Sequence, residues 1–178
     1  MTEKVILVDN NDNEIGVMEK IEAHKTAQLH RAVSVFIFNS KGELLLQKRS
    51  KNKYHSSCLW TNTACTHPRP NESNENAAVR RLYEEMGIKY VKLIKLFDFI
   101  YKEKVENGLT EYEFDHVFIG ISDDLPNPSP SEVYAFEYVA PNILLKQIQH
   151  NPEKYTVWFK KIIDRVLYEF QNLNFIET

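Results

Sequence analysis

A thiol and an imidazole stand two residues apart in one short segment of this chain. Cys65 and His67 belong to residues 60–68, a run with no helical or strand period. Other groups of comparable chemistry are His24, His30, Glu111 and Glu113. One thiol, three imidazoles and two carboxylates could move protons or hold a metal ion if the fold brings them to one site.

The imidazoles and carboxylates form a candidate set of metal ligands. The set comprises His24, His30, His67, Glu111 and Glu113. These nitrogen and oxygen ligands suit a divalent ion of intermediate hardness, so manganese, magnesium or zinc is expected. Glu111 and Glu113 project to the same side of a strand, although two such glutamates also occur on exposed sheet faces. A lone His24 or His30 is also typical of a polar loop, and their spacing does not match one helix face.

The cysteines and basic residues each have two interpretations. A free cysteine is usually a packing residue, which is the role assigned to Cys58. For Cys65, the polar neighbourhood and a nearby cation favour the thiolate. Four basic residues could form an anion pocket, although each alone is more typical of a solvated surface charge. These are Lys20, Arg49, Lys53 and Arg81.

Hydrophobic patterns place these groups on strands and helices. Strands are expected over residues 5–8, 15–18, 32–38, 44–47, 92–102, 110–121 and 133–139. The first two form an N-terminal hairpin, and the next two form a second hairpin. Helices are expected from a cap at Ser73 to Gly87, over 141–149 and over 156–171. Residues 49–70 lack a period and are expected to be a long functional loop.

Two positions in these elements bear on the chemistry. In the helix that ends at Gly87, Arg81 falls beside Glu85 at the edge of the apolar stripe, so Glu85 needs a cation, either Arg81 or a second metal. In the hairpin at 107–108, a two-residue loop pairs Tyr101 with Phe114, whereas a three-residue loop pairs Tyr101 with Glu113. The remaining histidines, His55, His116 and His150, show no partner pattern and are assigned structural roles.

Composition sets the remaining bounds. The 178 residues carry a net charge of −3 and are 43% hydrophobic and 26% charged, which is typical of a globular protein. We expect a single α+β domain over 1–178, and no global basic field that would attract nucleic acid or membrane. No apolar run approaches the ~20 residues of a membrane span, and the first residues lack the pattern of a signal peptide. With two cysteines and no disulfide framework, a cytoplasmic protein is expected.

The segment from Thr66 to Ile88 resembles the Nudix box, G-x5-E-x7-R-E-U-x-E-E-x-G-U, where U is a bulky aliphatic residue. The matching positions are Glu72, Arg80, Leu82, Glu84, Glu85, Gly87 and Ile88. Thr66 replaces the first glycine, and Arg81 replaces the glutamate after the arginine. These departures argue against an ordinary Nudix hydrolase, in which glutamates hold the metals that activate water on a diphosphate.

Other segments resemble type 1 isopentenyl-diphosphate delta-isomerases, a family with the Nudix fold. Residues 61–68, Thr-Asn-Thr-Ala-Cys-Thr-His-Pro, resemble its catalytic-cysteine motif, and Glu111-Tyr112-Glu113 resembles its E-x-E motif. Leu29-His30-Arg31-Ala32 and Val157-Trp158 match further family segments. The resemblance spans residues 20 to about 160. It implies a Nudix-type mixed β-sheet sandwiched between α-helices, here with an extra N-terminal hairpin.

The resemblance implies a reaction that converts isopentenyl diphosphate into dimethylallyl diphosphate, a small-molecule substrate. One proton is added to C4 of the alkene and another leaves C2, with Cys65 and Glu113 as the acid and the base in an order left open. Tyr101 is expected to assist Glu113, and Trp158 to offer a π face to the carbocation.

The resemblance also assigns the ions and the charges. The ion held by the histidines and glutamates is expected to tune the acidity of the Glu113 carboxyl group. Glu85 holds a second ion, Mg²⁺, which bridges the diphosphate oxygens. The four basic residues supply the remaining positive charge for the diphosphate. This explains the departure from the box at Arg81, where a metal ligand has become a phosphate ligand. We expect a monomer or weak homodimer.

Two alternatives differ in chemistry. Glu84 and Glu85 are compatible with a Nudix hydrolase of a diphosphate-containing substrate, which would release phosphate and would not need Cys65. A non-enzymatic Nudix module would bind a diphosphate tightly without turnover.

Overall fold

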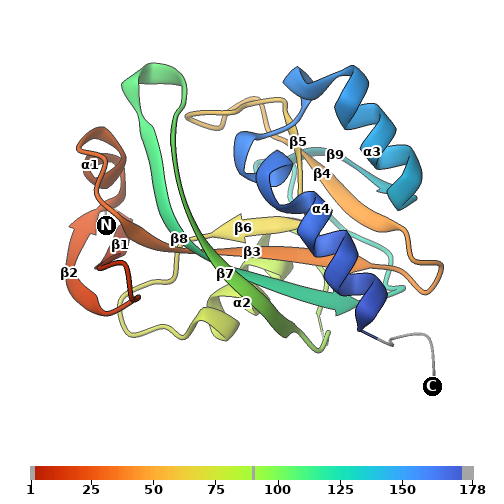
Figure 1. Cartoon of the computed structure of the whole chain (residues 1–178), viewed down its shortest axis with the longest axis horizontal. Coiled ribbons are helices and arrows are strands. Elements are labelled where there is room, and N and C mark those ends of the chain that lie inside the picture. The colour runs from red at the N-terminus through yellow and green to blue at the C-terminus, as the bar shows by residue number, and fades with distance from the viewer. Residues whose placement is uncertain (1–2, 90, 174–178) are drawn as a thin grey trace.

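The computed structural model describes residues 3–89 and 91–173, in which nine strands form one mixed sheet with helices on both faces (Figure 1). The strands are β1 (Lys4–Val8), β2 (Glu14–Glu19), β3 (His30–Phe38), β4 (Leu44–Arg49), β5 (Trp60–Thr61), β6 (Ala64–Thr66), β7 (Ile94–Lys104), β8 (Thr110–Ile121) and β9 (Val133–Val139). The helices are α1 (Lys20–Lys25), α2 (Asn74–Met86), α3 (Pro141–His150) and α4 (Val157–Asn172), with single 3-10 turns at Glu106–Gly108 and Pro152–Lys154.

Strand β3 is the centre of the sheet, and its alternating side chains build two cores. Phe36 and Phe38 pack in the cluster that includes α4, whereas Val35 and Ile37 pack in the cluster that includes α2. Because successive strand residues point to opposite faces, an almost wholly apolar strand is covered on both sides. The expected α+β sandwich of a mixed sheet between helices is therefore confirmed.

Helix α2 begins and ends where its capping residues predict. The Ser73 hydroxyl accepts from the Asn76 backbone N–H, and Gly87 closes the helix in the left-handed region at φ 69°. The two C-terminal helices and strands β8 and β9 agree with the sequence-based bounds to within one residue. The N-terminal hairpin is also present, since β1 and β2 pair antiparallel.

The second expected hairpin differs from the prediction. Strands β3 and β4 pair only at Phe38 and Leu44, next to the turn. Beyond that point β3 pairs with β6 and, in parallel, with β8, while β4 pairs with β5 and β9. The two flanks separate because residues 49–70, expected to be a long functional loop, contribute β5 and β6 between them. The short helix α1, which the sequence pattern did not predict, follows β2 directly.

Strands β7 and β8 form a long hairpin whose tip is the 3-10 turn at Glu106–Gly108. Asn107 and Gly108 there have positive φ values of 61° and 71°. This three-residue loop sets the register that pairs Tyr101 with Glu113. None of the helices in the described part of the chain combines the length and the apolar character that crossing a membrane takes.

Candidate functional site

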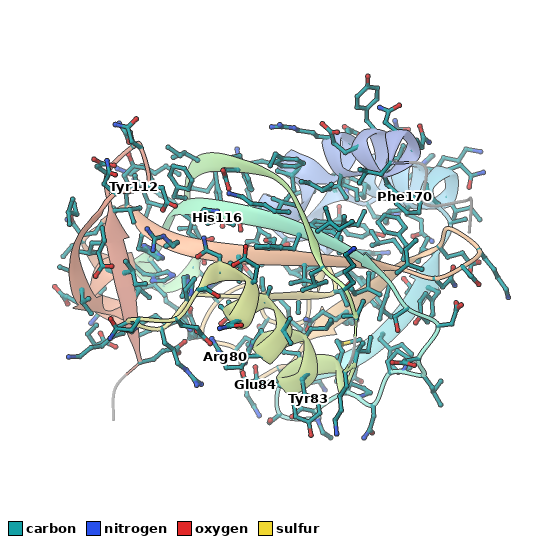
Figure 2. The ribbon with its side chains drawn as sticks, turned by 90° about the horizontal axis from the view of Figure 1, so that it is seen from below. Arg80, Tyr83, Glu84, Tyr112, His116 and Phe170 are labelled. Atoms are coloured by element: carbon teal, nitrogen blue, oxygen red, sulfur yellow. The ribbon has the colours of Figure 1, made fainter. Side chains whose placement is uncertain are left out.

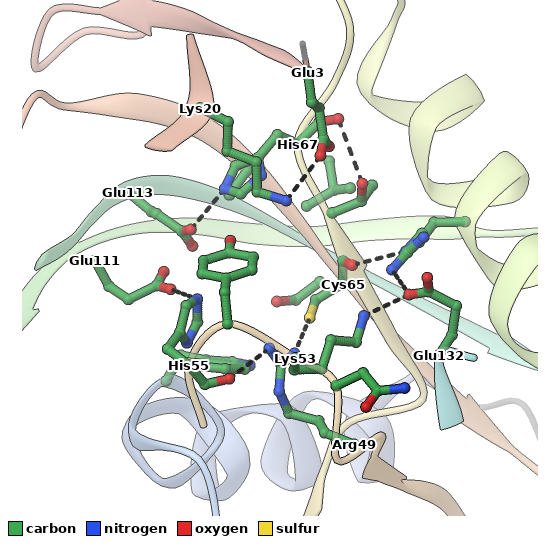
Figure 3. Close-up of a pocket in the computed structure, with 18 of the residues that line it drawn as sticks. Glu3, Lys20, Arg49, Lys53, His55, Cys65, His67, Glu111, Glu113 and Glu132 are labelled. Carbon is green, nitrogen blue, oxygen red and sulfur yellow. Dashed lines mark hydrogen bonds and ion pairs between the residues drawn. The ribbon is translucent and has the colours of Figure 1, made fainter. Parts of the chain in front are cut away.

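A cavity of about 300 Å³ brings most of the predicted site residues together (Figure 3). Its lining includes residues of α1, β3, β4, β6, α2, β7, β8 and α4 and of the segment between β4 and β5. The predicted residues in that lining are Lys20, Arg49, Lys53, Cys65, His67, Arg81, Tyr101, Glu111, Glu113 and Trp158. His24, His30 and Glu85 are fully or almost fully buried and contact residues of the lining. A volume at this scale suits a small molecule.

The histidines and glutamates meet at one buried point beside the cavity. One ligand atom from each of His24, His30, His67 and Glu113 lies within 4.8 Å of the others. The Nε2 atoms of His30 and His67 are 3.2 Å apart, and His67 Nε2 lies 2.9 Å from Glu113 Oε1. Glu111 is not among these four; its Oε1 lies 3.7 Å from His24 Nε2, and it forms a second, overlapping group with His24 and His55.

The fold orients these imidazoles by their backbone contacts. His24 lies on α1 and its Nδ1 is 2.7 Å from the Lys20 carbonyl oxygen, while His30 begins β3 and its Nδ1 is 2.8 Å from the Gln28 carbonyl. A carbonyl can only accept, so these contacts assign the proton to Nδ1 and turn the Nε2 lone pairs to the centre. In parallel register, His30 lies opposite Glu113 on β8.

A divalent cation fits this donor set. Within the described residues, His24 Nε2 is buried and has no hydrogen-bond partner. Burial and the neighbouring His30 hold the pKa of His67 well below its usual range, so His67 is neutral. Burial alone would raise the pKa of Glu113, but the hydrogen bond and positive charge of His30 lower it, so Glu113 is ionised. Burial alone would lower the pKa of His30, but the hydrogen bond to Glu113 raises it, so a metal ion would take the place of the proton on His30 Nε2. Neutral imidazole and ionised carboxylate are the states that bind a metal.

Tyr101 on β7 and Cys65 on β6 both line the cavity, from strands that are separated by β8 and β3. The Tyr101 hydroxyl donates to Glu113 Oε2 over 2.7 Å. Cys65 on β6 lies opposite Ser34 on β3, and its Sγ is 3.9 Å from Arg49 Nη1. Burial raises the pKa of Cys65 to about 12 and outweighs the lowering by Arg49. The expectation that a nearby cation favours the thiolate is therefore wrong for this structure, in which Cys65 is a protonated thiol.

The indole ring of Trp158 closes the cavity from α4. The residue is only 3% exposed, and its indole N–H donates to Asn62 Oδ1 over 3.2 Å. The guanidinium carbon of Arg49 lies 5.2 Å from the ring centroid. The Arg49 guanidinium therefore makes a cation–π contact with one face of this ring.

Three of the four basic residues are paired with carboxylates, whereas Arg49 donates to the backbone oxygens of His55 and Ser56. Arg81 Nη2 contacts Glu85 Oε1 at 2.6 Å, and Lys53 Nζ lies 3.4 Å from the same oxygen. Both cations also contact Glu132 Oε2 at 2.5 Å. Lys20 Nζ is paired with Glu3 Oε2 at 3.0 Å. Arg81 thus provides the cation that the buried Glu85 requires, and Lys53 joins it.

Sequence reasoning missed two residues of this site. His55, for which the sequence showed no partner pattern, is 4% exposed and its Nε2 lies 2.7 Å from Glu111 Oε1. Its position in a polar segment without a period, two residues after Lys53, was the available signal. Glu132 holds Lys53 and Arg81, whose hydrogen bonds and charge lower its pKa to about 2 although burial raises it. The sequence around Glu132 contains no pattern that predicts this role.

Two charged residues of the box, Arg80 and Glu84, lie on the outer side of α2 (Figure 2). Arg80 donates to both carboxylate oxygens of Glu72 at 2.7 and 2.9 Å, and its Nη1 lies 3.1 Å from Glu84 Oε2. Arg81 and Glu85 face the cavity side instead. One helix therefore separates a structural ion-pair cluster from the pair that borders the cavity.

The chain is similar to known proteins over most of its length. Residues 28–159 match the NUDIX domain family. An isopentenyl-diphosphate Delta-isomerase of Pectobacterium atrosepticum is 47% identical over 163 residues, which cover 92% of this chain and 90% of that protein. Isopentenyl-diphosphate Delta-isomerase 1 of Aromatoleum aromaticum is 49% identical over 167 residues, with 94% of each chain covered.

A solved structure supports the fold. The crystal structure of DR0079 from Deinococcus radiodurans superimposes with a TM-score of 0.77 and covers 92% of this chain and 98% of that one. The sequences are 22% identical, so this likeness concerns the fold alone.

Proposed function

Because this chain belongs to the isopentenyl-diphosphate Delta-isomerases of the Nudix family, we propose that Cys65 and Glu113 are the pair that moves protons in its reaction. The enzyme converts isopentenyl diphosphate into dimethylallyl diphosphate. One C–H bond forms at C4 and one breaks at C2, so one group donates a proton and another accepts one. The observation that carries the proposal is that Cys65 and Glu113 line the same cavity.

The cavity supplies what a carbocation needs. Protonation of an unactivated alkene creates a tertiary cation, which water would trap. Trp158 covers the site with an indole face, and the indole N–H is held by Asn62, so the ring is fixed. Tyr101 holds Glu113 through its hydroxyl and keeps that carboxylate directed into the cavity.

The two metal sites are part of the proposal. His24, His30, His67, Glu111 and Glu113 hold one divalent ion, for which manganese, magnesium and zinc are the candidates. When bound, that ion favours the ionised form of Glu113 and fixes its orientation. Glu85 holds a Mg²⁺ that neutralises the diphosphate oxygens.

The charged residues account for recognition of the diphosphate. Lys53, Arg81, Glu85 and Glu132 form a cluster with two positive and two negative groups. Such a cluster has no net charge to offer a diphosphate, and a Mg²⁺ held at Glu85 would add the positive charge that Lys53 and Arg81 alone do not provide. Arg49 and Lys20 complete the basic side of the cavity.

Isotope exchange tests the proposal. The protein is incubated with isopentenyl diphosphate and Mg²⁺ in D2O and followed by NMR. We expect dimethylallyl diphosphate that carries deuterium, and loss of this product in Cys65→Ser with a native circular dichroism spectrum. Cys58→Ser is the matched control, because Cys58 is outside the cavity lining, and it keeps the activity. Full turnover by Cys65→Ser would contradict the role of Cys65.

Phosphate release separates the hydrolase alternative. A hydrolase releases phosphate from a nucleoside diphosphate derivative and keeps its rate in Cys65→Ser, whereas the proposed enzyme leaves the diphosphate intact. Tight diphosphate binding without turnover would instead favour a binding module. We further propose that residues 1–178 act as one domain in the cytoplasm, as a monomer or weak homodimer without nucleic-acid or membrane partners. Light scattering of the purified protein checks the oligomeric state.

A further inference from the structure

His55 is a buried histidine that no step of the proposed reaction uses. Its Nε2 lies 2.7 Å from Glu111 Oε1, on the side facing the metal ligands (Figure 3). Its Nδ1 lies 3.2 Å from the Ser56 hydroxyl oxygen. A carboxylate oxygen only accepts, so this contact assigns the proton to Nε2 and leaves Nδ1 to accept from Ser56.

The contact fixes the orientation of Glu111. One carboxylate oxygen of Glu111 accepts from His55, and the other lies 3.2 Å from the Tyr101 hydroxyl. Because the single hydroxyl proton of Tyr101 goes to Glu113, the hydrogen bond from His55 is the contact that restrains the Glu111 carboxylate, whose Oε1 also lies 3.7 Å from His24 Nε2. Donors of this kind, one bond removed from the metal, usually raise its affinity.

The ring of His55 is itself held from several sides. Tyr54 packs edge-on with ring centroids 4.4 Å apart, and Trp158 does so at 6.1 Å. Arg49 donates to the backbone oxygens of His55 and Ser56 over 3.2 and 3.0 Å. One short segment therefore connects Arg49, on the basic side of the cavity, with a ligand of the metal centre.

We propose that His55 is a positioning residue of the metal centre, which holds Glu111 in place by a hydrogen bond and does not bind the ion itself. The inference rests on the proposed function. The competing assignment is a second ion, since ligand atoms of His24, His55 and Glu111 also lie within 4.8 Å of one another. The positioning role is favoured because His55 Nε2 is 2.7 Å from a carboxylate oxygen and donates to it, whereas His24 Nε2 has no hydrogen-bond partner among the described residues.

Mn²⁺ binding tests this role without reference to turnover. Calorimetry and electron paramagnetic resonance give the dissociation constant and the number of ions bound to the full chain. In His55→Phe, which keeps a ring against Tyr54 and Trp158, we expect Mn²⁺ to bind about ten- to hundredfold more weakly with the number of ions unchanged. His55→Gln, whose amide can donate to Glu111, recovers part of the affinity. His150→Gln, at an exposed histidine, is the control and binds Mn²⁺ as the native protein does.

Three results would overturn the inference. Native affinity in His55→Phe would show that the hydrogen bond does not position Glu111. Loss of one bound ion would make His55 a ligand of a second site. Absence of Mn²⁺ binding by the native protein would remove the metal centre, and with it this part of the proposed function. Thermal unfolding verifies each variant, and His55→Asn, whose amide is too short to reach Glu111, replaces His55→Phe if that variant does not fold.

Discussion

Tyr101 and Glu113 are direct cross-strand partners on β7 and β8, and the Tyr101 hydroxyl donates to Glu113 Oε2 over 2.7 Å. The pairing depends on the length of the hairpin loop, because a loop shorter by one residue would place Phe114 opposite Tyr101. The three-residue turn at Glu106–Gly108 therefore decides which side chain supports the proposed catalytic carboxylate.

Removing this hydroxyl is expected to slow turnover. In Tyr101→Phe the carboxylate keeps its contact with His67 but loses the donor on its other oxygen. We expect kcat to fall at least about tenfold, or about 1.4 kcal/mol, with KM little changed because Tyr101 does not contact the basic residues. Steady-state kinetics check this, with Tyr83→Phe on the exposed side of α2 as the control. A native kcat in Tyr101→Phe would contradict the supporting role.

Arg81 is expected to act mainly on substrate affinity. Arg81→Gln removes a cation that borders the cavity and leaves Glu85 with Lys53 and Gln47 as partners. We expect KM for isopentenyl diphosphate to rise at least about tenfold, and Arg81→Lys to recover only part, because lysine lacks the planar fork. Arg69→Gln, at an exposed arginine outside the cavity lining, keeps the native KM. An unchanged KM in Arg81→Gln would exclude Arg81 from diphosphate binding.

Two glycines with the same backbone conformation are expected to respond differently to a methyl group. Gly87 and Gly108 have φ values of 69° and 71°. A Cβ on Gly87 would lie 2.6 Å from the backbone oxygen of Asn127, whereas a Cβ on Gly108 meets nothing within 4 Å. We expect Gly108→Ala to cost about 1 kcal/mol of unfolding free energy from strain alone. Gly87→Ala is expected to cost more than about 2 kcal/mol, because a backbone segment must also move.

Urea unfolding of both glycine variants measures the difference. Equal losses of unfolding free energy would show that the chain near Asn127 relaxes freely. That segment is held to the end of α2, since the Asn127 N–H donates to the Met86 carbonyl over 2.8 Å. Free relaxation is therefore not expected.

The ion pair between Glu72 and Arg80 is expected to make stability fall in acid. The hydrogen bond from Arg80 lowers the pKa of Glu72 below its ordinary value of 4.5. A lowered pKa in the folded state stabilises the protein above the unfolded pKa, and this stabilisation is lost as pH falls through the folded value. Between about pH 6 and pH 3, the native protein should lose about 1 kcal/mol more than Glu72→Gln does.

Unfolding in urea at each pH checks this expectation. Glu75→Gln, in the first turn of α2, controls for loss of a charge near the helix start. Parallel pH profiles for the native protein and Glu72→Gln would show that the pair contributes nothing to acid sensitivity.

The sequence by itself determined the local elements and the candidate chemistry. Short stretches of sequence were enough to predict the caps at Ser73 and Gly87 and the apolar runs of β3 and β8. This is because helix caps and hydrophobic periods depend on residues that are near neighbours in the chain. The motif around Cys65 and the altered box indicated the family for the same reason, because order and spacing along the chain carry that information.

Only the tertiary structure decided how these groups meet. The parallel register that brings His30 to Glu113 joins residues far apart in sequence, and such pairing depends on which faces are buried in the assembled sheet. His55 and Glu132 entered the site in the same way, since their partners lie on other elements. The protonated state of Cys65 also follows from burial, because only the packed fold removes the thiol from water.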